Sequence, residues 1–287
     1  MKRILITGKG SYIGTNFKQT LDQFPDKYNI DELDMLNESW KQYDFSKYDV
    51  VYHVAGLAHS TPNESQRDLY YQVNSDLTYE VAVKSKESGV KQFIFMSSII
   101  VYGSGEVGKK RIITKNTPLT PDNFYGDSKK QAELKIQPLE DENFKIVILR
   151  PPMIYGPGSK GNYSLLSKLA KNTPVFPKFR NERSMLFLGN LIEFVRLMID
   201  NEEQGIFHPQ NQEYVSSCDL VKEIANVYDH KIYFISMLNP LLCLLKREKY
   251  INKLFGNLTI EKSLSKYKLD YCKYQFEESI RVTEVLL

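Results

Sequence analysis

Short apolar runs alternate with amphipathic stretches through the first half of this chain. Four apolar runs, each followed by a polar or glycine-containing segment, are typical of buried strands: 3–7, 49–54, 92–97 and 145–149. Two stretches with helical spacing of apolar residues lie among them: 13–23 and 73–88. Strands that alternate with helices over about 150 residues predict an α/β fold with a parallel sheet covered on both faces.

The alternation weakens after Pro151 and Pro152. The segment that follows, Tyr155-Gly156-Pro157-Gly158, has the residues of a turn. Helical spacing returns in three later stretches: 165–171, 190–200 and 219–228. We therefore expect a domain of residues 1–152 and a smaller C-terminal substrate-binding lobe of residues 153–287, which returns one strand or helix to the sheet.

Composition narrows the class of protein. The chain has 287 residues, of which 42% are hydrophobic, so it can bury a sizeable core, and its net charge of +3 is too small to indicate nucleic acid or an anionic membrane surface as a partner. The longest apolar stretch, Pro240–Leu245, is far shorter than a membrane span, and we expect no signal peptide. Three separated cysteines fit a reducing compartment, and four histidines without metal-ligand spacing indicate no metal site. A soluble cytoplasmic protein is predicted.

A glycine-rich loop, Thr7–Gly14, lies between the first predicted strand and the first predicted helix. Glycines let backbone N–H groups approach a pyrophosphate, and a helix N-terminus favours its negative charge. The loop therefore predicts a dinucleotide cofactor and a Rossmann-type, doubly wound sheet. Its candidate cofactor-binding residues are Gly8, Gly10, Ser11, Tyr12, Ile13 and Gly14.

An acidic residue near the end of the expected second strand bears on the choice of cofactor. Asp34 lies 20 residues after Gly14, where a carboxylate can bind both ribose hydroxyls of NAD and would repel the extra phosphate of NADP. Asp31 is a competing candidate. The cation of Lys9 favours NADP instead, because a cation in this loop could bind the extra phosphate. We expect NAD, with NADP as the alternative.

Tyr125 and Lys129 are four positions apart, so both fall on one face of a helix. An ammonium group near a phenol favours the phenolate, and a tyrosine with a lowered pKa can move protons to and from a sugar hydroxyl. Alone this spacing is weak evidence, because a half-buried tyrosine beside a solvated lysine is common.

Together these features resemble the extended short-chain dehydrogenase/reductase family, in particular its nucleotide-sugar epimerase/dehydratase group and bacterial UDP-glucose 4-epimerase-like proteins. Thr7–Gly14 resembles the family's glycine loop, except that Gly10 stands one place before the usual glycine at position 11. The segment Met96–Gly103 resembles the signature Ser-Ser-x-x-Val-Tyr-Gly, and it places Ser98 on the catalytic Ser/Thr, 27 residues before Tyr125. The resemblance implies that Ser98, Tyr125 and Lys129 are catalytic.

Other segments resemble parts of the family's cofactor site. His53–Leu57 resembles the segment that follows the fourth strand and passes along the cofactor. Asp44 and Phe45 resemble the pair against the adenine, and Asn74 matches an asparagine that opens the next long helix. The cofactor-binding residues implied by the resemblance, beyond those of the loop and Asp34, are Asp44, Phe45, Val54, Ala55, Gly56, Asn74, Tyr125, Lys129 and Pro151.

The second half resembles the family's substrate lobe. The run Leu149–Gly158 resembles a family segment ending in Tyr-Gly-Pro, and Arg183 matches an arginine that clamps the nucleotide diphosphate. The resemblance implies that Ser98, Asn162 and Arg183 bind substrate. Many 4-epimerases place an asparagine at the position of Met153, which cannot make the same hydrogen bonds.

The implied reaction is hydride transfer at a sugar carbinol, as in a 4-epimerase that works through a 4-keto intermediate in surface-polysaccharide sugar biosynthesis. A 4-keto nucleotide-sugar reductase is the alternative. The related 4,6-dehydratases carry Asp-Glu after the catalytic threonine, whereas this chain has Ile99 and Ile100, which cannot transfer protons. A hypothesis of another class, a non-catalytic dinucleotide sensor, has no need of Ser98, Tyr125 and Lys129 together. A homodimer is expected by resemblance only.

Overall fold

The computed structural model describes residues 1–58, 64–244 and 248–285, and the chain divides into two compact units. The first unit comprises residues 1–103, 119–150 and 192–208. The second comprises residues 104–118, 151–191 and 209–287. The chain therefore passes between the units more often than a single boundary at residue 152 implies.

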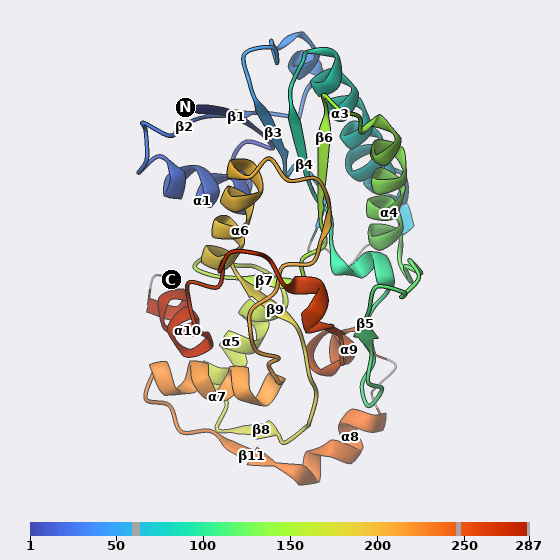
Figure 1. Ribbon diagram of the computed structural model, residues 1–287. Coiled ribbons are helices and arrows are strands. Elements are labelled where there is room, and N and C mark those ends of the chain that lie inside the picture. Colours follow the sequence, from blue (N-terminus) through green and yellow to red (C-terminus); the bar gives the residue numbers. More distant parts are fainter. Residues whose placement is uncertain (59–63, 245–247, 286–287) are drawn as a thin grey trace. The chain divides into compact units, whose positions relative to one another are not determined.

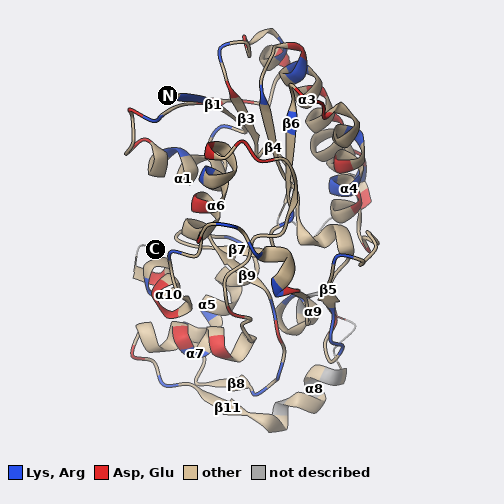
Figure 2. Ribbon diagram, in the orientation of Figure 1, with Lys and Arg blue, Asp and Glu red and all other residues tan. Residues whose placement is uncertain are grey.

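The first unit contains a six-stranded sheet in which all strand pairs are parallel (Figure 1). Its strands are β1 (Lys2–Thr7), β2 (Tyr28–Leu33), β3 (Val50–His53), β4 (Gln92–Met96), β6 (Lys145–Leu149) and β10 (Gly205–Phe207). The inner strands β3 and β4 carry no Lys, Arg, Asp or Glu (Figure 2), as expected of strands buried on both faces. The predicted Rossmann-type parallel sheet is confirmed.

The strand order, β10-β6-β4-β3-β1-β2, determines where a ligand can bind. The chain runs from β1 outward to β2 and then crosses to β3 on the other side of β1. Only a 3-10 turn, Glu38–Gln42, lies between β2 and β3. In open α/β sheets, ligands bind at the carboxyl ends of the strands where the order reverses. Here that point lies at the ends of β1 and β3.

Helices cover both faces of this sheet (Figure 1). On one face, α3 (Leu77–Glu87) and α4 (Phe124–Ile136) supply Val81, Ala82, Ala132 and Ile136 to a core cluster with side chains of β1, β3 and β4. On the other face, α1 (Tyr12–Leu21) places Phe17 edge-to-face against Tyr52 of β3, with ring centroids 5.1 Å apart. The helix α6 (Leu188–Asp200) enters the first unit at residue 192.

The second unit has three short parallel strand pairs and five helices among its described residues. The paired strands are β7 (Met153–Tyr155) with β9 (Met185–Phe187), β8 (Val175–Pro177) with β11 (Tyr233–Ile235), and β5 (Ile112–Ile113) with β12 (Thr259–Ile260). The helices are α5 (Asn162–Asn172), α7 (Ser217–Val227), α8 (Asn239–Leu244), α9 (Lys249–Phe255) and α10 (Phe276–Val285). They enclose one apolar cluster that includes Tyr155, Leu166 and Ile224. No helix in the described ranges is long and apolar enough to cross a bilayer.

Candidate active site

The glycine loop joins β1 to α1. Gly8 and Gly10 have positive φ angles of 116° and 73°, and a Cβ atom at Gly8 would lie 2.8 Å from the backbone nitrogen of Ala55. Ser11 has a φ of −68° and caps α1, because its side chain accepts a hydrogen bond from Gly14 N at 3.2 Å. The displaced Gly10 therefore makes the left-handed turn, and Ser11 occupies a conformation open to any residue.

Several features of this loop fit the pyrophosphate of a dinucleotide. The backbone N–H groups of Gly8 and Lys9 donate to Leu33 O, at 3.0 and 3.1 Å, which ties the loop to the end of β2. The helix α1 then begins at Tyr12, and its first N–H groups form a site that attracts phosphate. The Tyr12 hydroxyl is buried and has no hydrogen-bond partner among the described residues, so a polar cofactor group would satisfy it.

The two aspartates proposed to select the cofactor have different surroundings in the structure. Asp31 lies within β2 and accepts a hydrogen bond from the Tyr48 hydroxyl at 2.6 Å. Asp34 directly follows β2, is exposed, and accepts a hydrogen bond from Leu36 N at 2.8 Å. A third carboxylate, Glu32, accepts a hydrogen bond from Gly10 N at 3.3 Å. Glu32 and Asp34 thus lie where β2 meets the loop, and both carboxylates would repel the extra phosphate of NADP.

The segment after β3 lies against the glycine loop. The N–H groups of Val54 and Ala55 both donate to Thr7 O, at 3.1 and 2.9 Å. A Cβ atom at Gly56 would lie 3.0 Å from Lys129 Nζ, so this glycine leaves room for the lysine. The segment follows the third strand of the chain rather than the expected fourth, because no strand forms between β2 and β3.

Asp44 and Phe45 differ in what their side chains do. Asp44 is exposed and accepts a hydrogen bond from Ser46 N at 3.0 Å. Phe45 is only 1% exposed and packs in the core cluster of the first unit. Its ring therefore contributes to packing, so Asp44 is the member of the pair whose side chain is accessible to a ligand.

Asn74 is fully buried and joins two segments of the first unit. Its side chain accepts from Leu57 N at 2.8 Å and donates to Leu57 O and to Ser128 Oγ, at 3.2 and 3.1 Å. The sequence led us to expect that Asn74 opens a helix, and this prediction was wrong. A π-helical turn, Gln72–Asp76, contains it, and the helical segment already begins at Arg67 with α2 (Arg67–Tyr71). Such turns are frequent at functional sites.

The side-chain hydroxyls of Ser98 and Tyr125 lie close enough for Ser98 to affect the pKa of Tyr125. Ser98 follows β4 and caps a 3-10 turn, Ile99–Tyr102, because its Oγ accepts from Ile100 N at 3.3 Å. Tyr125 is the second residue of α4. Burial raises the pKa of the Tyr125 phenol above its ordinary value, and the Ser98 hydroxyl opposes that rise.

Lys129 lies one turn further along α4 and is buried. Its Nζ donates to Met96 O at 2.9 Å and lies 4.8 Å from the centre of the Phe95 ring. Burial lowers the pKa of Lys129 to about 8, and the carboxylate of Glu133 opposes that shift. The causes of the shift in the Tyr125 pKa are burial, Ser98 and Tyr70, and Lys129 is not among them. The lowering of that pKa by Lys129, which the sequence led us to expect, therefore stays a prediction.

The two predicted substrate-binding residues of the second unit share a partner. Asn162, the first residue of α5, and Arg183 both donate to Lys253 O, and Arg183 also donates to Leu254 O at 3.1 Å. The guanidinium group thus contacts carbonyl oxygens at the end of α9, and no carboxylate pairs with it among the described residues. Burial lowers the pKa of Arg183 to about 10. Met153 packs against the core of this unit.

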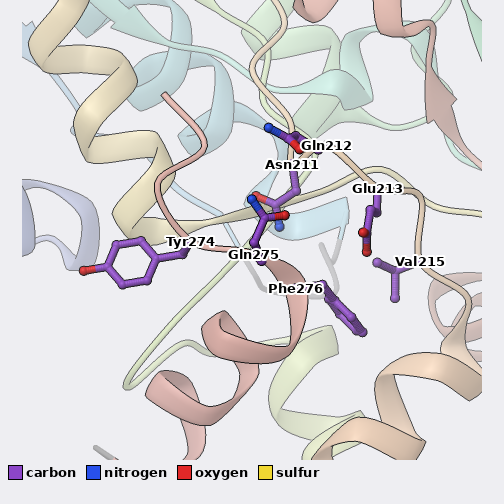
Figure 3. A pocket seen from close by; sticks show the side chains of 7 residues that line it. All are labelled: Asn211, Gln212, Glu213, Val215, Tyr274, Gln275 and Phe276. Carbon is purple, nitrogen blue, oxygen red and sulfur yellow. The ribbon is translucent and has the colours of Figure 1, made fainter. Parts of the chain in front are cut away.

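A pocket in the second unit is too small for a sugar. Its volume is about 10 Å³, which is room for about one water molecule. Figure 3 shows its lining side chains, with the ring of Tyr274 pointing away from the others. The lining residues are Asn211, Gln212, Glu213, Val215, Tyr274, Gln275 and Phe276. Asn211 is already bonded to Phe187 N, Asn190 and Tyr155, which indicates a structural role.

A family model described as the NAD dependent epimerase/dehydratase family matches residues 4–208, a range that contains the glycine loop, Ser98, Tyr125 and Lys129. The chain belongs to this family. UDP-glucose 4-epimerase of Vibrio cholerae is 30% identical over 282 residues, which cover 90% of this chain and 84% of that protein. N-acetyl-alpha-D-glucosaminyl-diphospho-ditrans,octacis-undecaprenol 4-epimerase of Escherichia coli O157:H7 is 27% identical over 257 residues, covering 83% and 76%.

A solved structure of similar fold is UDP-N-acetylglucosamine 4-epimerase from Methanobrevibacter ruminantium M1, in complex with UDP-N-acetylmuramic acid. Its TM-score is 0.76 at 19% identity, and the match covers 99% of this chain and 97% of that one. Family membership confirms the resemblance found in the motifs, the classification as an enzyme, and NAD as the cofactor. The roles of individual residues stay predictions.

Motif reasoning missed a buried polar network behind these residues in the first unit. Arg150 forms a two-pronged ion pair with Glu133, which also accepts a hydrogen bond from Ser97 Oγ at 2.5 Å. Arg150 donates to the Tyr102 hydroxyl at 2.6 Å, and that hydroxyl bonds to His208 Nε2 at 2.8 Å. Burial and the charge of Arg150 lower the pKa of His208 to about 4, so the ring is neutral at neutral pH.

This network, defined as Ser97, Glu133, Arg150, Tyr102 and His208, fixes the turn that carries Ser98. Tyr102 ends the turn that Ser98 caps, and Glu133 lies one helical turn beyond Lys129 in α4. The sequence holds one sign of it, because Glu133 continues the four-residue spacing of Tyr125 and Lys129.

Gly126 is a second residue that motif reasoning missed. A Cβ atom there would lie 2.7 Å from Ile100 O, so only glycine lets α4 approach the Ser98 turn this closely. That approach brings Tyr125 within hydrogen-bonding reach of Ser98. A glycine directly after the tyrosine is the sequence signal for it.

Proposed function

We propose that this protein is a 4-epimerase of nucleotide sugars, of UDP-hexose or UDP-N-acetylhexosamine, that works through a 4-keto intermediate in surface-polysaccharide sugar biosynthesis. The observation that carries the proposal is the juxtaposition of Ser98, which follows β4, with Tyr125 and Lys129 of α4, where Lys129 Nζ bonds to the last carbonyl oxygen of β4. The 30% identity with UDP-glucose 4-epimerase of Vibrio cholerae supports the same reaction. We also propose that the protein is cytoplasmic.

Three side chains would carry the proton chemistry. Bound NAD supplies a reversible hydride acceptor. Tyr125 removes the proton of the sugar O4 hydroxyl and later returns it, while Ser98 donates a hydrogen bond to the same oxygen and orients it. Lys129, with a pKa of about 8, is mostly protonated at neutral pH, so its ammonium can hold the cofactor ribose and favour the Tyr125 phenolate.

Elimination of water is a poor fit for this site. It needs an acid and a base next to the catalytic hydroxyl, but the two residues that follow Ser98 are Ile99 and Ile100. Ile99 is 4% exposed and belongs to the core. We therefore place the protein among the epimerases of its family rather than among the dehydratases.

The substrate diphosphate is assigned to the second unit. Arg183 carries a charge that only carbonyl oxygens contact, and its fork of donors suits two phosphate oxygens. Asn162 shares Lys253 O with Arg183 and belongs to the same cluster. A hexose on a polyprenyl diphosphate is a second candidate substrate, because the relative from Escherichia coli O157:H7 is named for one and aligns with 83% of this chain.

A panel of UDP-hexoses and UDP-N-acetylhexosamines, each deuterated at C4, tests the reaction. We expect the C4 epimer by NMR without added NADH, and the deuterium retained at C4 because hydride leaves and returns to the same carbon. A sugar on undecaprenyl diphosphate is tested in parallel. Loss of the C4 deuterium, or no epimer from any substrate, would contradict the proposal.

The reductase alternative is tested in a second experiment, with a 4-keto nucleotide sugar and added NADH or NADPH. A reductase consumes NADH or NADPH in proportion to a 4-keto nucleotide sugar and gives one product, whereas an epimerase reaches the same mixture from either epimer. Retained NAD binding without turnover of any sugar would favour the non-catalytic sensor. Light scattering tests the homodimer that we also propose.

A further inference from the structure

The second unit has an exposed segment that combines apolar and basic side chains, which we name the basic apolar edge. It lies on β8, on β11 and on the turn and helix α8 that follow (Figure 1). Its apolar members are Val175, Tyr233, Met237 and Leu244, which are 41%, 55%, 87% and 78% exposed. Its basic members are the exposed residues Lys178, Arg180 and Lys231.

The strand register explains why apolar side chains face outward here. β8 and β11 pair in parallel, with Tyr233 opposite Val175 and Phe234 opposite Phe176. Phe176 is 2% exposed and belongs to the core of the unit, with its ring 6.2 Å from that of Phe234. Because successive side chains of a strand alternate between faces, the Val175 and Tyr233 pair forms an outward apolar strip.

Hydrogen bonds join the elements of the edge. Lys178 N donates to Ile235 O at 3.2 Å, which continues the pairing beyond the strands. Asn239, the first residue of α8, donates through its side chain to Lys178 O at 2.9 Å. The segment that follows β8 therefore adjoins both the end of β11 and the start of α8.

The charge of this surface has one sign. Residues 172–181 and 230–244 contain no Asp or Glu, although the whole chain has 35 acidic and 38 basic residues. Figure 2 shows no red on β8, β11 and the described part of α8, and it shows blue on the segments that flank β8 and β11. Lys231 lies over the ring of Tyr233, with Nζ 5.3 Å from the ring centre, so a cation lies directly on the apolar strip.

We propose that the basic apolar edge binds the surface of an anionic lipid bilayer. Met237, Leu244 and Tyr233 would enter the headgroup region, where apolar and aromatic side chains leave water, and the basic members would contact lipid phosphates. A second copy of the chain fits less well, since a two-fold contact between two such edges would set like charges against each other.

This surface is separate from the proposed reaction, and its role revises the expectation that the protein has no membrane partner. The absence of a membrane partner was inferred from the net charge of the whole chain and from the length of its apolar runs. Neither quantity describes a local surface, and peripheral binding needs no helix that spans the bilayer.

Co-sedimentation with vesicles tests the proposal without any turnover. The full chain is mixed with vesicles of phosphatidylcholine alone or with about one-third phosphatidylglycerol, and we expect binding only to the second kind, weakened by salt. Lys178→Gln and Lys231→Gln should each weaken binding about fivefold. Met237→Ser with Leu244→Ser should weaken it about tenfold or more.

Leu36→Ser is the matched control, because Leu36 is 94% exposed in the first unit and should leave vesicle binding unchanged. All these residues are exposed, so melting temperatures should stay at the wild-type value. Equal binding to both kinds of vesicle, no binding to either, or edge variants that bind like wild type would overturn the proposal. So would self-association of the wild type in solution that the edge variants abolish.

Discussion

In the first unit the buried charges of Glu133 and Arg150 pair with each other, whereas in the second unit Arg183 has no carboxylate partner among the described residues. Glu133 and Arg150 are both buried and form a two-pronged ion pair, which Ser97 and Tyr102 complete. Arg183 is held by the carbonyl oxygens of Lys253 and Leu254. The difference teaches that the first arrangement is complete before a ligand binds, while the second still has charge to offer to an anion.

The largest effect should come from removing the hydroxyl of Tyr125. We expect Tyr125→Phe to lower kcat by about a thousandfold or more, because in the proposed mechanism Tyr125 is the group that transfers the sugar proton. NAD binding should persist, measured by absorbance of the released cofactor. Full activity in this variant would show that Tyr125 is not the group that transfers the sugar proton.

The buried ion pair should give the next largest effect, on stability. Glu133→Gln leaves Arg150 charged and uncompensated, so we expect a loss of about 3 kcal/mol in the free energy of unfolding. Adding Arg150→Gln should recover part of it. Glu193→Gln is the control, because Glu193 and Arg196 form a partly exposed pair and should change stability by under about 1 kcal/mol. Equal losses in both single variants would remove the contrast between buried and exposed pairs.

In the second unit, Arg183→Gln should act on binding. We expect the KM for a nucleotide sugar to rise about 10- to 100-fold with a small change in kcat, since the charge serves to hold an anion. Arg180→Gln, at an exposed position three residues earlier, should leave KM unchanged. A kcat that falls as far as in Tyr125→Phe would assign Arg183 to the chemistry instead.

A further effect concerns the dependence of stability on acid. Burial lowers the pKa of His53 to about 3 and, with Arg150, that of His208 to about 4, and both lie in the first unit. Below an unfolded pKa of about 6.5, the unfolded chain binds protons that the folded one does not. Stability should therefore fall as pH drops from about 6.5 towards 4, by up to about 1.4 kcal/mol per pH unit for each histidine.

Two probes can read this acid effect unit by unit. Trp40 is the only tryptophan and is buried in the first unit, so its fluorescence should report unfolding by urea at lower concentrations as pH falls. Hydrogen exchange over residues 209–244 reports on the second unit, which we expect to respond less. His208→Gln should reduce the pH dependence, and an unchanged slope would contradict this origin.

The sequence was most informative where local pattern decides structure. The inner strands β1, β3, β4 and β6 were predicted from apolar runs, because strands buried on both faces need them. Tyr125 and Lys129 were proposed from their spacing on one helix, and Ser98 was proposed from the resemblance of Met96–Gly103 to a family signature; their catalytic roles stay predictions. The start of the helix before Asn74 was placed too late, because it was placed from apolar spacing that begins only at Val73.

Other features depend on distant residues and left little trace in the sequence. Glu133 and Arg150 look like ordinary surface charges in a sequence, and only the fold buries them together. His208 bonds to Tyr102 across 106 positions. The strand pairs of the second unit have two or three residues per strand, too few for an alternating pattern to appear.

The Ser98 hydroxyl has one hydrogen, which it can donate to either of two acceptors. A serine hydroxyl donates one hydrogen bond and accepts two, and Ser98 Oγ already accepts from Ile100 N, which anchors the oxygen but leaves the hydrogen free to rotate. That hydrogen can point to Tyr125 or to a sugar oxygen, and not to both at once. When a substrate draws it away, the phenol loses the bond that lowers its pKa, so arrival of the sugar changes the acidity of the group that will act on it.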